Sequence, residues 1–183
     1  PCTVPEGRWT PVEFYIPAAG TDQEFKLYVD GEQKHSFKCS EAPSLRNISL
    51  GITGSRDGCP PFYMDTFSIS KTFHGTAAAD VNTGGNTPAP AEQPARPRDS
   101  QKSRILGHWS FDGDSASIFK DSGELGQHGV VYSAERVQGR SGRAFMFNGT
   151  TDRLELTKSI PFPAAGTIAF WIKRDPRQQG VSA

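Results

Sequence analysis

Residues 76–103 constrain the fold more than any other part of the chain, because they cannot form a core. They contain no aromatic residue, no Ile and no Leu, and Val81 is their only branched apolar residue. Prolines stand at positions 88, 90, 94 and 97. Such a segment cannot bury enough apolar surface to offset the entropy lost on ordering. We therefore predict a flexible, Pro/Gly-rich linker at 76–103, between folded parts at 1–75 and 104–183.

The part before the linker shows the alternation of apolar and polar residues that is typical of short strands. The strand predicted at 24–30 places Phe25, Leu27 and Val29 on one face. Asp30-Gly31 follows directly and favours a tight hairpin turn.

A second strand is predicted at 62–70. Strict alternation would place Tyr63, Asp65, Phe67 and Ile69 on one face of that strand. This prediction depends on an uninterrupted period of two along the whole segment.

The part after the linker continues the same pattern. In 167–173, Ile168, Phe170 and Ile172 lie on one face and Trp171 lies on the other. Further short strands are predicted at 12–16, 106–111, 129–133, 144–148 and 153–157. Many short strands between Gly, Asp and Pro turns, without a long amphipathic helix, predict an all-β antiparallel β-sandwich.

The charge balance excludes two classes of partner. Lys plus Arg is 20 and Asp plus Glu is 20, so the formal net charge is 0. A nucleic-acid-binding surface is usually basic, and an anionic membrane also attracts basic segments. No apolar run approaches the ~18 residues of a membrane span. We therefore expect neither nucleic acid nor a membrane span.

Three cysteines stand at positions 2, 39 and 59, in no zinc-binding spacing. A disulfide between Cys39 and Cys59 would staple a stretch of short strands, leaving Cys2 unpaired or bonded to another chain. Asn47-Ile48-Ser49 and Asn148-Gly149-Thr150 are formal glycosylation sequons. Together these features favour an extracellular location, secreted or at the cell surface.

Several short motifs follow one another along the chain in a recognisable order. After the linker come Gly107–Asp112, Asp121–Gly123, Gly129, Gly139–Gly149, Asp152–Leu156 and Thr167–Ile172. Before it come Gly7–Trp9, Leu27–Gly31, Leu50–Ile52 and Met64–Ile69. The first series resembles the opening half of the laminin-G-like, concanavalin A-like lectin jelly-roll family, and the second resembles its closing half. The resemblance implies a jelly roll present as two half-modules.

The order of the halves is reversed relative to that family, since the closing half precedes the opening half. Three interpretations follow. The chain is a piece of a protein with tandem modules, or its halves complete one permuted sandwich, or they complete sandwiches with neighbouring copies. A half-sandwich exposes an apolar face and unpaired strand edges, so the last alternative predicts self-association by strand complementation.

The family resemblance also implies a possible calcium site at the rim of the sandwich. Asp65 and Asp121 map onto it, and Asp112 lies close to another predicted strand end. Calcium prefers several oxygen ligands, often carboxylates. Asp65 and Asp121 lie in opposite halves and can share an ion only if the halves pair. The alternative is that these residues form solvated turns.

The resemblance to the laminin-G-like lectin family implies glycan binding, which is a common function of that fold. Aromatic rings pack against the C–H groups of sugars, and Tyr28, Tyr63 and Trp171 are the candidate ligand-binding residues. Glycosidase chemistry needs a pair of carboxyl groups, and the chain has no Glu-x-Asp-x-x-Glu run. We expect a non-catalytic protein for carbohydrate binding or cell-surface adhesion, with a glycan or a surface or matrix protein as partner. The alternatives are a self-assembling structural subunit and an accessory module of a polysaccharide-active enzyme.

Overall fold

The computed structural model describes residues 4–17, 23–39, 48–51, 60–71, 105–113, 115–160 and 165–175. These residues form twelve strands and no helix, so the described protein is all-β. Among the described residues there is therefore no helix that is long and apolar enough to cross a membrane. The linker predicted at 76–103 lies outside the described residues.

The strands form two antiparallel sheets. The large sheet has eight strands in the order β3-β2-β1-β12-β5-β10-β9, and β6 also pairs with β5. Its strands are β1 (Thr10–Ile16), β2 (Gln23–Val29), β3 (Glu32–Cys39), β5 (Phe62–Ser70), β6 (Ile105–Trp109), β9 (Glu135–Gln138), β10 (Arg143–Phe147) and β12 (Gly166–Arg174). The small sheet has the order β4-β11-β8-β7. Its strands are β4 (Ser49–Gly51), β7 (Ile118–Phe119), β8 (Gly129–Tyr132) and β11 (Arg153–Leu156).

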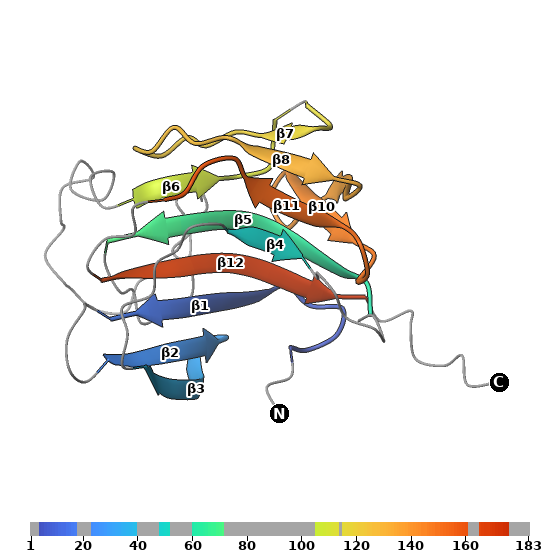
Figure 1. The fold of residues 1–183 in the computed structure, drawn as a ribbon. Coiled ribbons are helices and arrows are strands. Elements are labelled where there is room, and N and C mark those ends of the chain that lie inside the picture. The colour runs from blue at the N-terminus through green and yellow to red at the C-terminus, as the bar shows by residue number, and fades with distance from the viewer. Residues whose placement is uncertain are drawn as a thin grey trace, which may run out of the picture.

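The two parts of the chain share both sheets. β12, which follows the predicted linker, lies between β1 and β5, which precede it (Figure 1). β10 and β6 pair with β5 in the same way, and β11 pairs with β4. Within this chain the two parts therefore complete each other's sheets, which is the arrangement expected if they form one sandwich.

The core lies between the two sheets. It combines Phe67, Trp109 and Phe145 from the large sheet with Phe119 and Leu154 from the small one, and each is at most 1% exposed. Burying a side chain of this size contributes about 1.5–3 kcal/mol. This shared core gives the protein a β-sandwich-like, all-β architecture.

The prediction that Tyr63, Asp65, Phe67 and Ile69 share one face is wrong. The register between β5 and β12 shifts between Phe170 and Trp171, and it leaves Thr66 without a partner residue. Thr66 has a φ of 48°, as expected of a residue in a β-bulge. The extra residue reverses the alternation, so Phe67 and Ile69 point into the core while Tyr63 and Asp65 point away from it.

The hairpin predicted at Asp30-Gly31 is confirmed. It joins β2 to β3, and the two residues have φ values of 56° and 76°. Positive φ at both central positions is the geometry of a type I′ turn, which matches the twist of the flanking strands.

Candidate functional site

The side chains of interest lie on the outer face of the large sheet, meaning the side that faces away from the small sheet. Residues alternate between the two faces along each strand. In β1, Val12 is in register with the core residue Phe170, so Glu13 lies on the outer face. Cross-strand register then defines one row across five strands, formed by Tyr28, Glu13, Ala169, Ser68 and His108. We call this set the central row.

Glu13 is the most unusual member of the central row. It is only 2% exposed, and neither of its carboxyl oxygens has a hydrogen-bond partner. Its direct neighbours across the sheet, Tyr28 and Ala169, carry no positive charge. Burial alone raises the pKa of Glu13 to about 7, because the charged form loses its hydration and gains no counterion.

Two further polar groups on this face share that property. The Thr167 hydroxyl and the His108 Nδ1 are buried without a hydrogen-bond partner. Burial lowers the pKa of His108, although Asp121 and Asp112 oppose the change. Because buried polar groups in native proteins are normally hydrogen-bonded, three such groups on one face point to a functional surface.

The three candidate ligand-binding residues all lie on this outer face. Tyr28 belongs to the central row, where its hydroxyl donates to Gln33 at 3.2 Å. Trp171 lies one row away, in register with Asp65 on one side and Pro11 on the other. The guanidinium of Arg140 lies over the Trp171 ring, 4.0 Å from its centroid.

Tyr63 lies further along the same face. Its ring meets that of Trp9 edge to face, with centroids 6.4 Å apart. The Lys173 ammonium lies over both rings, at 4.4 Å from Tyr63 and 5.1 Å from Trp9. The Tyr63 hydroxyl donates to Asp175 at 3.1 Å. The outer face thus carries half-buried aromatic rings from one end of β12 to the other.

Asp65 joins the outer face to the turn between β9 and β10. It is 1% exposed, and its Oδ2 accepts the backbone N–H groups of Arg140 at 2.7 Å and Ser141 at 3.1 Å. Burial raises the pKa of Asp65, although these N–H donors and the Thr66 hydroxyl oppose the change. A Cβ at Gly139 would stand 2.6 Å from Asp65 Oδ2, so this close approach requires glycine.

The other two candidate metal ligands have backbone partners of their own. Asp112 accepts the Arg143 N–H at 2.8 Å. Asp121 accepts three N–H groups on its two oxygens, from His108 at 2.8 Å, Gly123 at 2.7 Å and Gln127 at 2.9 Å. In the described part of the chain, no three His, Cys, Asp or Glu side chains gather as a metal site would require. Backbone N–H donors therefore satisfy the carboxyl groups of Asp65 and Asp121 without a bound ion.

The predicted disulfide lies outside what the structure describes. Cys59 is not among the described residues, and Cys39 is placed only as the last backbone position of β3. The pairing of these two cysteines therefore stays a prediction.

Sequence patterns singled out the aromatic residues but not Glu13. A Glu between Val12 and Phe14 ordinarily indicates a solvated strand face, because the outer face of a sandwich usually meets water. The signal that could have identified it is the aromatic content of neighbouring outer positions, namely Tyr15 on the same strand and Tyr28 and Trp171 on the adjacent ones.

Comparison of the chain with protein-family models, curated proteins and solved structures found no match.

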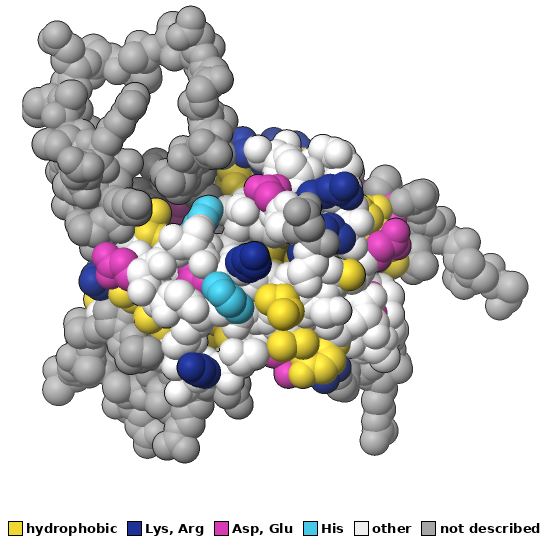
Figure 2. Space-filling model, turned by 90° about the horizontal axis from the view of Figure 1, so that it is seen from above, with side chains coloured by type: hydrophobic (Ala, Val, Ile, Leu, Met, Phe, Trp, Pro, Cys, Tyr) yellow, Lys and Arg dark blue, Asp and Glu magenta, His cyan; other side chains and the backbone are white. Residues whose placement is uncertain are grey.

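On the face that Figure 2 shows, Lys and Arg side chains are interspersed with Asp and Glu side chains, in agreement with the neutral composition.

Proposed function

We propose that the protein is a non-catalytic carbohydrate-binding β-sandwich of the laminin-G-like jelly-roll type, acting outside the cell. Its binding surface is the outer face of the large sheet. The partner is a glycan, free or carried by a surface or matrix protein, and binding of this kind serves adhesion.

One observation carries the proposal. The aromatic residues Tyr28, Trp171 and Tyr63 share one face with three buried polar groups that have no hydrogen-bond partner. A sugar presents C–H groups that pack on aromatic faces and hydroxyl groups that pair with polar side chains. Glu13 can accept from two hydroxyl groups, whereas Thr167 can both donate and accept. The three rings are half-buried and reach solvent, whereas Glu13 and Thr167 are buried in the free protein and pair with a sugar once binding uncovers them.

The same geometry argues against hydrolysis. A glycosidase places two carboxyl groups on either side of the scissile bond, roughly 5–10 Å apart. The residues directly across the sheet from Glu13 are Tyr28 and Ala169, neither of which is acidic. Asp65, two strands away, is already bonded to two backbone N–H groups. We therefore assign Glu13 to binding.

Binding to a glycan array tests this function, with the protein applied both in calcium and in EDTA. We expect binding in at least one condition, and retention in EDTA would show that no metal is needed. Trp171→Ala should weaken binding at least tenfold, because it removes the central ring of the face. Tyr28→Phe keeps the ring and loses only the hydroxyl, so it should weaken binding less than Trp171→Ala does. Absence of binding in both conditions would defeat the proposal.

Self-association through sheet edges is the second candidate. β3 is an edge strand of the large sheet, and its Phe37 is 45% exposed. Phe37 stacks on Phe25 with a centroid distance of 4.9 Å, at the end of an aromatic row that begins at Phe14. An exposed aromatic residue on an edge strand invites pairing with another chain. Sedimentation should then show oligomers that Phe37→Lys dissociates, and a monomer at all concentrations would exclude this alternative.

A further inference from the structure

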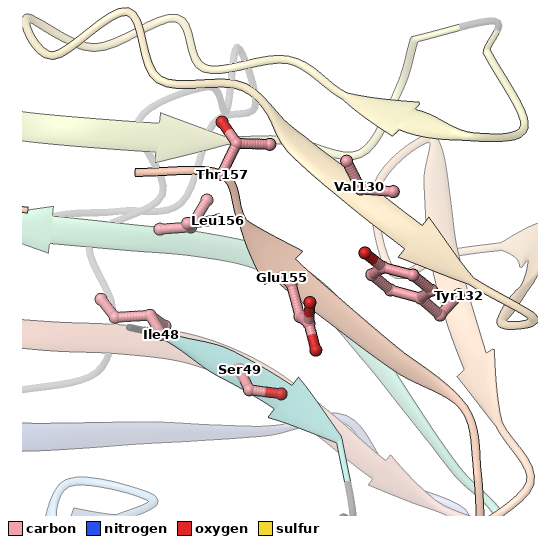
Figure 3. A pocket seen from close by; sticks show the side chains of 7 residues that line it. All are labelled: Ile48, Ser49, Val130, Tyr132, Glu155, Leu156 and Thr157. Atoms are coloured by element: carbon pink, nitrogen blue, oxygen red, sulfur yellow. The ribbon is translucent and has the colours of Figure 1, made fainter. Parts of the chain in front are cut away.

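The outer face of the small sheet carries a second, separate group of ligand-like side chains. Glu155 lies in the middle of β11, in register with Ser49 on β4 and Val130 on β8. Tyr132 lies two residues along β8, in register with Arg153. Figure 3 shows Glu155 and Tyr132 on neighbouring strands, with Thr157 further along the chain from Glu155, and all three line one depression.

The size and accessibility of this depression suit a small ligand. Its volume is about 580 Å³, within the ~300–1,000 Å³ range of small-molecule sites. Tyr132 is 37% exposed, one of the few large apolar side chains among the described residues that reach solvent to this extent. In contrast to Glu13, the side chains of Tyr132, Glu155 and Thr157 in this depression reach solvent.

The charges of the depression favour a neutral ligand. Arg153 Nε donates to Glu155 Oε1 at 2.6 Å, so the two charges cancel locally. The Arg153 guanidinium also lies 4.0 Å from the centroid of the Tyr132 ring, which fixes the ring in place. The pair retains N–H donors and carboxylate acceptors, and Ser49 contributes a hydroxyl. An aromatic ring beside matched donors and acceptors with no net charge is complementary to a neutral sugar.

We infer that this depression, formed by Ser49, Val130, Tyr132, Glu155 and Thr157, is a second binding site for a neutral sugar unit, and that the protein therefore cross-links glycan chains. The two sites lie on opposite outer faces of two packed sheets, and packed sheets are themselves ~10 Å apart. One short oligosaccharide cannot reach both faces. The inference of cross-linking rests on the proposed function of the large-sheet face.

Calorimetric titration of the full chain tests this inference. The probes are neutral hexasaccharides of β-1,4-glucose, β-1,3-glucose, β-1,4-mannose and β-1,4-xylose. We expect two molecules of the best-binding hexasaccharide per protein. Tyr132→Ala should reduce this to one, and so should Trp171→Ala. Ile118→Ala is the matched control, because Ile118 is 43% exposed on the neighbouring strand but does not line the depression.

The variants separate the two proposals. A stoichiometry of one that Tyr132→Ala leaves unchanged would overturn the second site and retain the large-sheet face. A stoichiometry of one that Tyr132→Ala abolishes and Trp171→Ala leaves unchanged would retain the depression and defeat both the large-sheet face and cross-linking. Absence of binding to all four neutral probes would overturn the second site, whereas the glycan array decides separately on the large-sheet face. Circular dichroism of each variant checks that a loss of binding is not a loss of fold.

Discussion

The two outer faces of the molecule carry similar side chains in different surroundings. On the large sheet, Glu13 and Asp65 are 2% and 1% exposed. On the small sheet, the side chains of Arg153 and Glu155 are 33% and 38% exposed and pair with each other. The carboxyl groups of Glu13 and Asp65 are held away from water, whereas that of Glu155 meets both water and a cation.

The position of each residue in its sheet accompanies the difference. Glu13 lies on β1 inside an eight-stranded sheet, with Tyr28 and Ala169 as its direct cross-strand neighbours. β11 lies in a four-stranded sheet, and its neighbour β4 has only three residues. The direct cross-strand neighbours of Glu155 are Ser49 and Val130, and neither has a ring that could cover its carboxyl group. The same residue type is therefore expected to respond to mutation and to pH differently on the two faces.

Removing a carboxyl group should reduce stability most on the outer face of the large sheet. Asp65→Ala leaves the N–H groups of Arg140 and Ser141 and the Thr66 hydroxyl without their acceptor. We expect a loss of about 2–4 kcal/mol in the free energy of unfolding, measured by urea titration. Glu155→Ala is the matched control and should cost less than ~1 kcal/mol, because it breaks only a solvent-exposed ion pair. Equal losses would contradict the contrast between the faces.

The pH dependence of stability should come from Glu13, on the outer face of the large sheet. The pKa of Glu13 is raised from 4.5 to about 7 in the folded protein, so folding favours its protonated form. The stabilisation from the protonated Glu13 is fully present below the pKa of the unfolded chain. It is lost as pH rises through the pKa of the folded protein, by up to about 3 kcal/mol in the free energy of unfolding.

Glu13→Gln removes this ionisation while keeping the shape of the side chain. The variant should gain stability relative to the parent chain between about pH 4.5 and pH 8, and Glu155→Gln should not. Urea titrations at several pH values measure the difference. A parent and a Glu13→Gln variant with parallel pH profiles would show that Glu13 is solvated.

The sequence predicted where the strands lie better than it predicted which face of the sheet each side chain occupies. The alternation at 24–30 and 167–173 is uninterrupted, and β2 and β12 follow it closely. At 62–70 one additional residue, Thr66, reverses the alternation, and no local pattern marks a bulge that depends on pairing with β12. The buried state of Glu13 was equally inaccessible, because it depends on neighbours from β2 and β12, which are brought together only in the folded sheet.

The smallest effect on stability is expected for a substitution at Arg153, on the outer face of the small sheet. Arg153→Gln removes both the ion pair with Glu155 and the contact with the Tyr132 ring. Because the pair is partly exposed, we expect a loss of at most ~1 kcal/mol, which diminishes as salt concentration rises. Urea titration at low and high salt measures it, and a large loss that is independent of salt would indicate a buried pair.

The state of the Glu13 carboxyl group tests the central claim most directly, namely that the outer face of the large sheet holds desolvated polar groups suited to a ligand. Carbon-detected NMR can follow that carboxyl carbon through a pH titration, with its signal assigned by comparison with Glu13→Gln. We predict a midpoint of about 7, which falls when a bound sugar donates hydrogen bonds to the carboxylate. A midpoint at the ordinary value of 4.5 would contradict the account.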